Sequence, residues 1–434
     1  MAGNVKMKTK GVRTSTCESR SLDVNPSASH FGYYRTVDES RLRDFLCIAG
    51  WAELYRTKPD AARASAAAAL ERWISAGLQY RESGAGQRLF DPAETLNFAK
   101  ALGLRDEDDF WERAYVATGR YLIDDATSRA ASSRGFRVRL ERHVNLAHYD
   151  AGARVRLHLP LPLEDASADE VRVVPITDGD VRIEPGRLVA SVRVPPEKIA
   201  SLAAEIDIAC LPERSRGKAG VDDLDLYLRP REDLIEITPR IAALACELRG
   251  GTTDSAEAVR AFWTFFLERM MLGVVHYDSL PAQNTLDAVI DSGLFDCRLG
   301  TALLVALCRA SGIPARMLGG YKLYAIPFDH FWAEVWRDDR GWQPLDLIFW
   351  DLSLRGRDAM WRERFFANLD GGLTTEIFPR VFTGFPSIRF PNAWHALSRP
   401  IDDGAAFGLF SVETGALVYE DRLAVKVNAA PVLP

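Results

Sequence analysis

This chain of 434 residues lacks several features that would assign it to a common class of protein. Its six cysteines include no C-x-x-C pair, so the sequence indicates neither a disulfide framework nor a thiolate zinc site. Acidic residues outnumber basic ones by 60 to 54, a net charge of −6, and no basic stripe points to a nucleic acid as partner. The longest apolar run, Ala302–Cys308, is too short to cross a bilayer, and we expect no membrane partner.

We also expect no secretory signal at the N-terminus. Lys6, Lys8 and Lys10 are not followed by an apolar segment, as a signal peptide requires. Residues 1–37 are polar and without periodicity, which predicts a flexible tail. Together with the scattered cysteines, these features lead us to expect a cytoplasmic protein.

The pattern that follows predicts a helical accessory domain over residues 38–133. Leu42, Phe45 and Leu46 fall on one helical face. Asp91 to Glu94 reads Asp-Pro-Ala-Glu, which places a cap residue, a first-turn proline and a glutamate in the positions of a capping box. No family that we can name matches this region, and a protein partner for it is an open expectation.

Strand-like alternation replaces the helical pattern in the next region. Residues 154–159 alternate basic and apolar side chains, and Asp178-Gly179 and Pro185-Gly186 are turn signals between further apolar runs. These features predict a small β-rich domain over residues 134–225. Helical patterns return after Thr238-Pro239, so residues 226–434 are predicted to hold an α+β catalytic core with a C-terminal extension.

A cysteine at the start of a predicted helix is the first candidate for chemistry. After Cys297, apolar residues recur at spacings of three and four until Ser311-Gly312 and Pro314 end the helix. Unpaired N–H groups in a first helical turn favour a thiolate. Most free cysteines are only small buried apolar residues, and we expect Cys308, within the apolar part of the same helix, to be one of these.

A histidine and an aspartate lie on two strands that are predicted to form a hairpin. His330 opens a half-buried aromatic strand, and a second strand leads from Trp342 to Asp346. A hairpin centred on Asp338, with a connection of three or five residues, would place 330 and 346 directly opposite on one face, whereas an even-numbered loop would separate them. Asp351 is an alternative to Asp346.

The sequence blocks around these residues resemble the transglutaminase-like superfamily in its bacterial form. The blocks begin at Cys297-Arg298, continue through residues 307–316 and 330–335, and end with Gly-Trp-Gln-Pro-Leu-Asp at 341–346. Weaker similarity extends the match to about residues 135–370. The resemblance implies a papain-like core, with helices before an antiparallel sheet, preceded by the β-rich domain and the helical region.

The resemblance also implies roles for individual residues. Cys297 would be the nucleophile, His330 the base and later the acid, and Asp346 the carboxylate that orients the imidazole. The backbone N–H of Cys297 would form part of the oxyanion hole, and Tyr277 lies where the family often has an aromatic residue that completes it. Trp332, in an aromatic cluster that is more often core than ligand platform, would contribute to the cleft.

Three positions depart from the family pattern. Phe295-Asp296 replaces the small, glycine-containing approach to the cysteine, Phe331 replaces an alanine, and Leu347-Ile348 replaces Pro-Thr. None of these changes removes a member of the triad. Together they indicate a remodelled pocket.

We therefore predict a cysteine acyltransferase that forms an amide through a thioester acyl-enzyme, without metal or organic cofactor. The expected partners are an acyl donor, which is a peptide, a small amide or a carrier-protein thioester, and an amine acceptor. A peptidase or amidase that uses water as acceptor is one alternative. A non-catalytic binding module on the same fold is the other.

Overall fold

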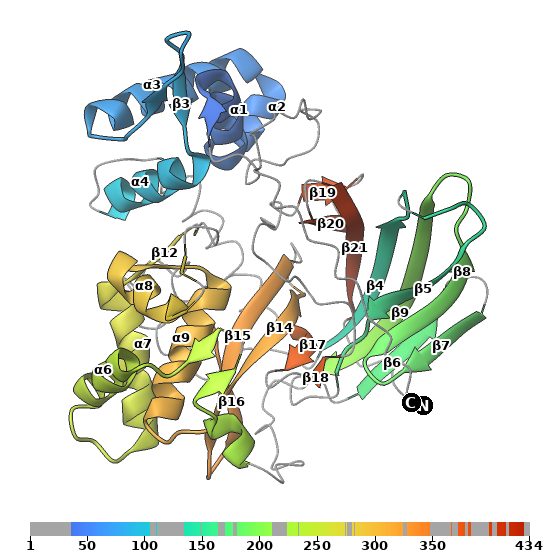
Figure 1. Cartoon of the computed structure of the whole chain (residues 1–434). Coiled ribbons are helices and arrows are strands. Elements are labelled where there is room, and N and C mark those ends of the chain that lie inside the picture. The colour runs from blue at the N-terminus through green and yellow to red at the C-terminus, as the bar shows by residue number, and fades with distance from the viewer. Residues whose placement is uncertain are drawn as a thin grey trace, which may run out of the picture.

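The structure, a computed structural model, is an α+β protein, which confirms the predicted fold class (Figure 1). It describes residues 36–104, 110, 134–147, 149–163, 170–176, 180–210, 224–232, 234–273, 275, 280–281, 283–323, 328–347, 366, 372–377, 381–382, 399–401, 406–413 and 416–428. The proposed tail therefore lies almost entirely outside the described residues. No helix within these ranges is long and apolar enough to cross a membrane.

The N-terminal region combines helices with a short sheet. Its helices are α1 (Glu39–Gly50), α2 (Ala52–Thr57), α3 (Pro59–Ser75) and α4 (Pro92–Leu104). The antiparallel sheet, in the order β1-β3-β2, was not predicted; its strands are β1 (Val37–Asp38), β2 (Arg81–Glu82) and β3 (Arg88–Phe90). One apolar core, with Trp73 and Phe90 among its members, joins helices and sheet. This region therefore has a core of its own.

The predicted cap before α4 is confirmed. One carboxylate oxygen of Asp91 accepts hydrogen bonds from the backbone N–H groups of Ala93 and Glu94, at 2.8 and 3.2 Å. These bonds satisfy N–H groups that the first helical turn leaves without a partner inside the helix.

The β-rich region is built from two antiparallel sheets that share one apolar core. Its strands are β4 (Arg134–Asn145), β5 (Arg154–Pro160), β6 (Glu170–Pro175), β7 (Asp180–Glu184), β8 (Arg187–Arg193) and β9 (Ile199–Cys210). C-terminal strands join the larger sheet, in the order β19-β20-β21-β4-β9-β6; they are β19 (Arg399–Ile401), β20 (Ala406–Glu413) and β21 (Ala416–Asn428). The C-terminal extension thus returns to the β-rich region.

The core that carries the candidate site has helices on one face of a five-stranded antiparallel sheet (Figure 1). The helices are α6 (Pro239–Arg249), α7 (Ser255–Arg269), α8 (Thr285–Ser292) and α9 (Cys297–Ala310). The sheet order is β16-β15-β14-β17-β18; the strands are β14 (Ala315–Lys322), β15 (Phe328–Arg337), β16 (Gly341–Leu345), β17 (Gly372–Ile377) and β18 (Val381–Phe382). Short elements complete the core: a 3-10 helix (Leu224–Leu228) and strands β10 (Arg231–Glu232), β11 (Ile235–Glu236), β12 (Met271–Leu272) and β13 (Leu294–Phe295).

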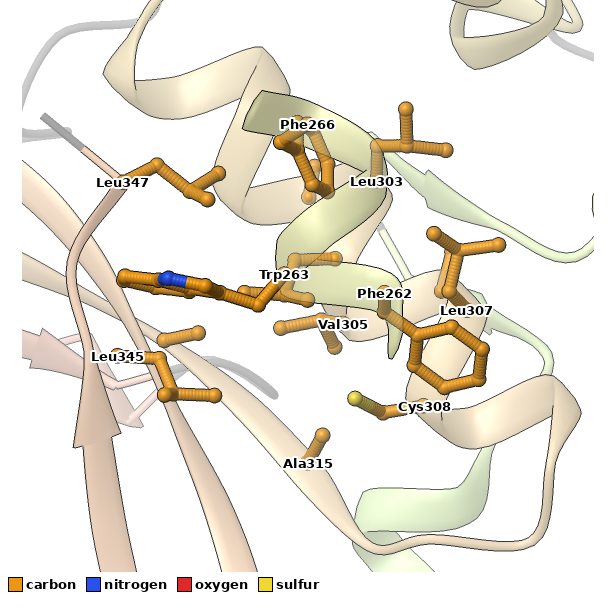
Figure 2. Close-up of a cluster of buried hydrophobic side chains, with 14 of the residues drawn as sticks. Phe262, Trp263, Phe266, Leu303, Val305, Leu307, Cys308, Ala315, Leu345 and Leu347 are labelled. Atoms are coloured by element: carbon orange, nitrogen blue, oxygen red, sulfur yellow. The ribbon is translucent and has the colours of Figure 1, made fainter. Parts of the chain in front are cut away.

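Helix α9 lies in the middle of the apolar core and is buried along nearly its whole length. Figure 2 shows Leu303 and Leu307 of α9 packed with Phe262 and Phe266 of α7, and Leu345 at the end of β16 in the same cluster. Burial of this kind stabilises by about 25 cal/mol per Å² of apolar surface removed from water. The packing therefore fixes α9, and with it the residue at its first position, relative to the sheet.

The N-terminal helical region contacts the core beside the segment that leads to Cys297. Lys100 of α4 is buried, and its Nζ donates a hydrogen bond to the backbone oxygen of Leu272 at 2.6 Å. A Cβ at Gly273 would lie 2.5 Å from Oδ1 of Asn97 on α4, so a larger residue there would require the Asn97 side chain to move. Since β12 pairs with β13, the helical region rests on the strands that precede α9.

Gly320 permits close pairing of β14 with β17, and its replacement tests the sheet. A Cβ there would lie 2.0 Å from the backbone oxygen of Leu373, at a bulge in the β14–β17 ladder. We expect Gly320→Ala to lower the free energy of unfolding by about 1–3 kcal/mol, because the backbone must move. Urea denaturation measures this effect, with Gly84→Ala as control because a Cβ at Gly84 has nothing within 4 Å. Equal stability of the two variants would contradict the close approach.

Candidate active site

Cys297 is the first residue of α9, as the sequence predicted. Asp296 caps the helix: its backbone is extended, and its carboxylate accepts the backbone N–H of Leu299 at 2.8 Å. The Cys297 side chain is partly exposed, in contrast to the other cysteine of the helix, Cys308, which is fully buried. The positive end of the helix dipole therefore lies at the sulfur and favours its ionised form.

The strands β15 and β16 form the predicted hairpin, with a different centre. Arg337 pairs with Gly341, so three residues connect the strands and the turn is centred on residue 339. The odd-numbered connection confirms that positions 330 and 346 share a face. Their expected position directly opposite each other is wrong: the register shifts by two residues, which makes them diagonal neighbours.

His330 and Asp346 nevertheless form a direct hydrogen-bonded pair. Nε2 of His330 lies 2.9 Å from Oδ1 and 2.8 Å from Oδ2 of Asp346. Both side chains are buried, with residue exposures of 1% and 0%. The Nε2–H group donates to the carboxylate, so Nδ1 is the ring nitrogen that can exchange a proton with a thiol.

The helix that begins with Cys297 packs directly against the strand that carries His330. The hydroxyl of Thr301 donates to the backbone oxygen of Phe331 at 3.4 Å. The guanidinium of Arg298, the residue after the cysteine, lies 5.6 Å from the centroid of the Phe331 ring. Phe331, which follows His330, therefore contacts Arg298, which follows Cys297, and the two elements are packed together here.

The three departures from the family pattern lie together around the first turns of α9. Phe295, Phe331 and Leu347 belong to one buried cluster. A Cβ at Gly300 would lie 2.3 Å from the Phe295 ring and 3.1 Å from Leu347, so this glycine makes room for two of the three large side chains. Phe295, Phe331 and Leu347 are thus packed in the apolar core.

Sequence reasoning missed one charged residue that touches this pair. Nζ of Lys322, at the end of β14, lies 3.5 Å from Oδ2 of Asp346 and 4.2 Å from the centroid of the Trp332 ring. Trp332, which was expected to line the cleft, is 2% exposed and stacks on the His330 ring at a centroid distance of 6.2 Å. From the sequence, the alternation along β14 could have predicted that Lys322 lies on the same face of the sheet as His330. The position of Asp346 next to Lys322 depends on the register of the β15–β16 hairpin, which the sequence does not determine.

Two sequence-predicted residues lie outside the described part of the chain. They are Tyr277, the proposed oxyanion partner, and Asp351, the alternative carboxylate. Their roles stay predictions. Within the described ranges, no group of three or more His, Cys, Asp or Glu side chains could hold a metal ion.

The His330–Asp346 pair and a helix N-terminus at Cys297 are features that nucleophilic catalysis by a thiol uses. A buried imidazole is oriented by a carboxylate, and a partly exposed cysteine stands at a helix N-terminus that packs on the same strand. Backbone N–H groups of a first helical turn can stabilise the oxyanion that forms when a thiolate attacks a carbonyl.

Residues 242–347 match a family model described as the transglutaminase-like superfamily. This segment contains Cys297, His330 and Asp346. The resemblance inferred from the sequence is therefore confirmed over residues 242–347, and this segment is a transglutaminase-like domain.

Similar proteins extend the comparison. A curated protein-glutamine gamma-glutamyltransferase from Pseudomonas aeruginosa is 33% identical over 127 residues, which is 26% of this chain and 18% of the relative. The chain thus spans less than a fifth of the length of that relative. A structure from Cytophaga hutchinsonii, provisionally assigned as a cysteine protease, is 14% identical, with a TM-score of 0.40. The match covers 68% of this chain and 91% of the Cytophaga chain. The periplasmic domain of TgpA from Pseudomonas aeruginosa is 18% identical, with a TM-score of 0.30. The match covers 52% of this chain and 95% of the TgpA domain.

One fully buried and one exposed cysteine allow a direct test of how burial controls thiol reactivity. Complete burial raises the pKa of the Cys308 thiol far above its usual range, whereas Cys246 is exposed on α6. We expect iodoacetamide at neutral pH to leave Cys308 unlabelled in the folded protein and to label it after unfolding in urea. Peptide mass spectrometry measures each site. Labelling of Cys308 as fast as that of Cys246 in the folded protein would contradict the packing of α9.

Proposed function

We propose that the protein is a cysteine-dependent acyltransferase that forms an amide bond through a thioester on Cys297. The observation that carries this proposal is the buried pair of His330, on β15, and Asp346, just after β16, whose side chains lie 2.8 Å apart. Strand β15 packs against the helix that begins with Cys297. The transglutaminase-like match over residues 242–347 supports the same class of chemistry. A binding module has no need for such a pair in a core whose helix begins with a partly exposed cysteine.

The first half of the proposed reaction acylates the enzyme. Nδ1 of His330 takes the thiol proton, and the thiolate of Cys297 attacks the carbonyl carbon of the donor. The new bond joins sulfur to carbon, while the bond from that carbon to the leaving amine or thiol breaks. His330 returns its proton to the leaving group. The backbone N–H of Cys297 is the proposed donor to the oxyanion, which draws on the positive end of the α9 dipole.

The second half transfers the acyl group to an amine. The nitrogen of the acceptor attacks the thioester carbon, and His330 takes the proton that this nitrogen loses. The carbon–sulfur bond then breaks to release the Cys297 thiolate, and the His330 imidazolium returns its proton to the sulfur to restore the thiol. If water attacks in place of the amine, the product is a carboxylic acid and the protein is a peptidase or amidase. Exclusion of water and capture of an amine decide between the two outcomes.

The donor is proposed to be a peptide carboxamide, a small amide or a carrier-protein thioester, and the acceptor an amine. The contact of Lys100 with Leu272 supports a role for the N-terminal helical region next to the site, where it is proposed to bind a protein partner such as the donor carrier. We keep the cytoplasm as the proposed compartment, with cell fractionation as its test.

The experiment uses the full chain with two donor probes and one amine. The donors are a mixture of glutamine-containing peptides and an acyl N-acetylcysteamine thioester, and the acceptor is a fluorescent alkylamine. Mass spectrometry of the products distinguishes amide from carboxylic acid, and an acid-quenched digest is searched for the acylated Cys297 peptide. We expect amide product that rises with amine concentration.

Three results would count against the proposal in different ways. Carboxylic acid alone at every amine concentration would exclude the transferase in favour of a hydrolase. An acyl group on the peptide of Cys246, the exposed cysteine, would contradict the assignment of the nucleophile. Absence of acylation and of product with both donors, in protein with a native unfolding transition, would favour the non-catalytic binding module.

A further inference from the structure

We propose that Asn97 and Lys100, on α4 of the N-terminal helical region, are positioning residues for Cys297. They contact the backbone that pairs with the segment leading into α9, so they help to set where that helix begins. The inference rests on the proposed function, because it assigns both residues a role in the acyl-transfer site. It makes the helical region a part of the catalytic unit.

Lys100 leaves its own region and is buried against the core. The residue is 3% exposed, and its Nζ donates a hydrogen bond to the backbone oxygen of Leu272 at 2.6 Å. A hydrogen bond from an ammonium group is shorter and stronger than one between neutral groups. Burial of a lysine is costly unless its charge is satisfied, since the charge loses its hydration. The contact therefore fixes the Leu272 carbonyl against α4.

Asn97 makes the neighbouring contact from the same face of α4. Residues three apart on a helix are neighbours on its surface, so Asn97 and Lys100 act on adjacent backbone positions. A Cβ added at Gly273 would lie 2.5 Å from Oδ1 of Asn97, which shows how closely the two approach. The apolar core of the helical region takes other residues of α4, which are Leu96, Ala99 and Leu102. Helix α4 thus packs into its own region with one stripe and holds residues 272 and 273 of the core with another.

The backbone that α4 holds is paired with the approach to Cys297. In the parallel pair of β12 and β13, Leu272 lies opposite Phe295, and the N–H of Gly273 donates to the backbone oxygen of Phe295 at 2.8 Å. Phe295 is followed by Asp296, the cap of α9, and then by Cys297. One residue therefore separates the strand pair from the proposed nucleophile.

A strand pair of this length needs support from other elements. Strands β12 and β13 are two residues long each and form a sheet of their own. An isolated two-stranded pair is at best marginally stable. One support comes from α7, because the Phe295 ring packs edge-on against Phe266 at a centroid distance of 5.1 Å. The other comes from α4, and its loss is expected to loosen the pair and the first turn of α9.

The first turn of α9 is where a small displacement matters for the proposed reaction. The Asp296 carboxylate accepts the N–H of Leu299 at 2.8 Å, and the backbone N–H of Cys297 is the proposed donor to the oxyanion. A misplacement of about 1 Å at reacting groups can cost about 10²-fold in rate. Loss of the α4 contact is therefore expected to lower kcat, while KM changes little because neither Asn97 nor Lys100 is proposed to touch a substrate.

Hydrogen exchange of single amides in the full-length protein tests the positioning without any substrate. In Lys100→Met, we expect the amides of Gly273 and Leu299 to exchange at least about tenfold faster, since local opening of the approach exposes both. Amides of the β4–β9 ladder report global unfolding and are expected to keep their rates. Lys58→Met removes an exposed lysine before α3 and is expected to change none of these rates. Unchanged exchange at Leu299 in Lys100→Met would overturn the proposal, because Lys100 would then only tether the two regions.

Kinetics of the same variants test the consequence for the reaction. With the donor and amine probes, we expect Lys100→Met to lower kcat at least about tenfold and to leave KM within about threefold of the parent value. Lys58→Met is expected to keep both parameters. A parent-like kcat in Lys100→Met, despite faster exchange at Leu299, would overturn the role in positioning Cys297.

A pair of size-changing variants tests the contact if methionine is not accommodated at residue 100. Gly273→Val places a branched side chain against Asn97, and we expect it to speed exchange at Leu299 at least about tenfold. Addition of Asn97→Ala removes the obstruction and is expected to restore most of the protection, because residues in contact are coupled. A double variant no better than Gly273→Val would contradict the coupling. If exchange changes as expected and the parent forms no acyl product with any donor, the proposed function fails while the positioning of α9 by α4 stands.

Discussion

Cys297→Ala is expected to abolish amide formation, with kcat/KM reduced at least about 10⁴-fold, because removal of the nucleophile removes the thioester route itself. Cys297 is partly exposed at the first turn of α9, whereas the residues from Arg298 to Arg309 are buried. The helix is held by its apolar face and by the Asp296 cap, so the variant should keep the stability of the parent. Initial rates with the donor and amine probes, together with urea denaturation, measure both quantities.

The matched control for this variant is Cys246→Ala, which removes an exposed cysteine on α6. It is expected to keep the full rate, because α6 supplies no residue of the proposed machinery. Residual amide formation by Cys297→Ala above one per cent of the parent rate would show that the acyl group is carried elsewhere.

Asp346→Ala is expected to lower both activity and stability. The carboxylate fixes the His330 ring, and the loss of an orienting group in such a triad costs about 10²–10⁴-fold in rate. It also pairs with the buried Lys322, and removal of one partner of a buried ion pair destabilises by about 3–5 kcal/mol. Product rates and denaturant midpoints of the same preparation measure the two effects.

Asp346→Asn separates orientation from charge. The amide oxygen can still accept the Nε2–H of His330, but the carboxylate charge is lost, so this variant is expected to lose about as much activity as Asp346→Ala. It removes the negative charge as fully as alanine does, so the loss of stability from an unmatched Lys322 should persist. Equal activity of Asp346→Ala and the parent protein would remove Asp346 from the mechanism.

Local sequence patterns predicted the parts of the site that depend on short-range structure. The apolar spacing after Cys297 and the stop at Ser311-Gly312 gave α9 its position, because a helix must bury one stripe. The parity of the β15–β16 connection placed residues 330 and 346 on one face, because strand side chains alternate. The centre of the turn was wrong by one residue, since a turn at Asp338 or at Asp339 satisfies the same alternation.

Features that depend on distant segments were not predictable in this way. Lys322 was overlooked because its ion-pair partner, Asp346, follows a different strand. The register of the hairpin that brings the two together cannot be determined from the sequence. The pairing of β21 with β4 joins residues far apart in the chain, and no local pattern encodes such a partner. The short sheet in the helical region was missed because β1 and β2 are two residues long.

We propose above all that His330, oriented by Asp346, activates the Cys297 thiol as a nucleophile. The direct measurement is the rate of Cys297 alkylation by iodoacetamide from pH 5 to 10, quantified on its own peptide, in the parent protein and in His330→Ala. We expect rapid labelling of the parent at pH 7 and labelling at least about tenfold slower in His330→Ala. In His330→Ala, the labelling rate should rise only as the pH approaches the ordinary pKa of a thiol. Equally slow labelling of both proteins at pH 7 would contradict it.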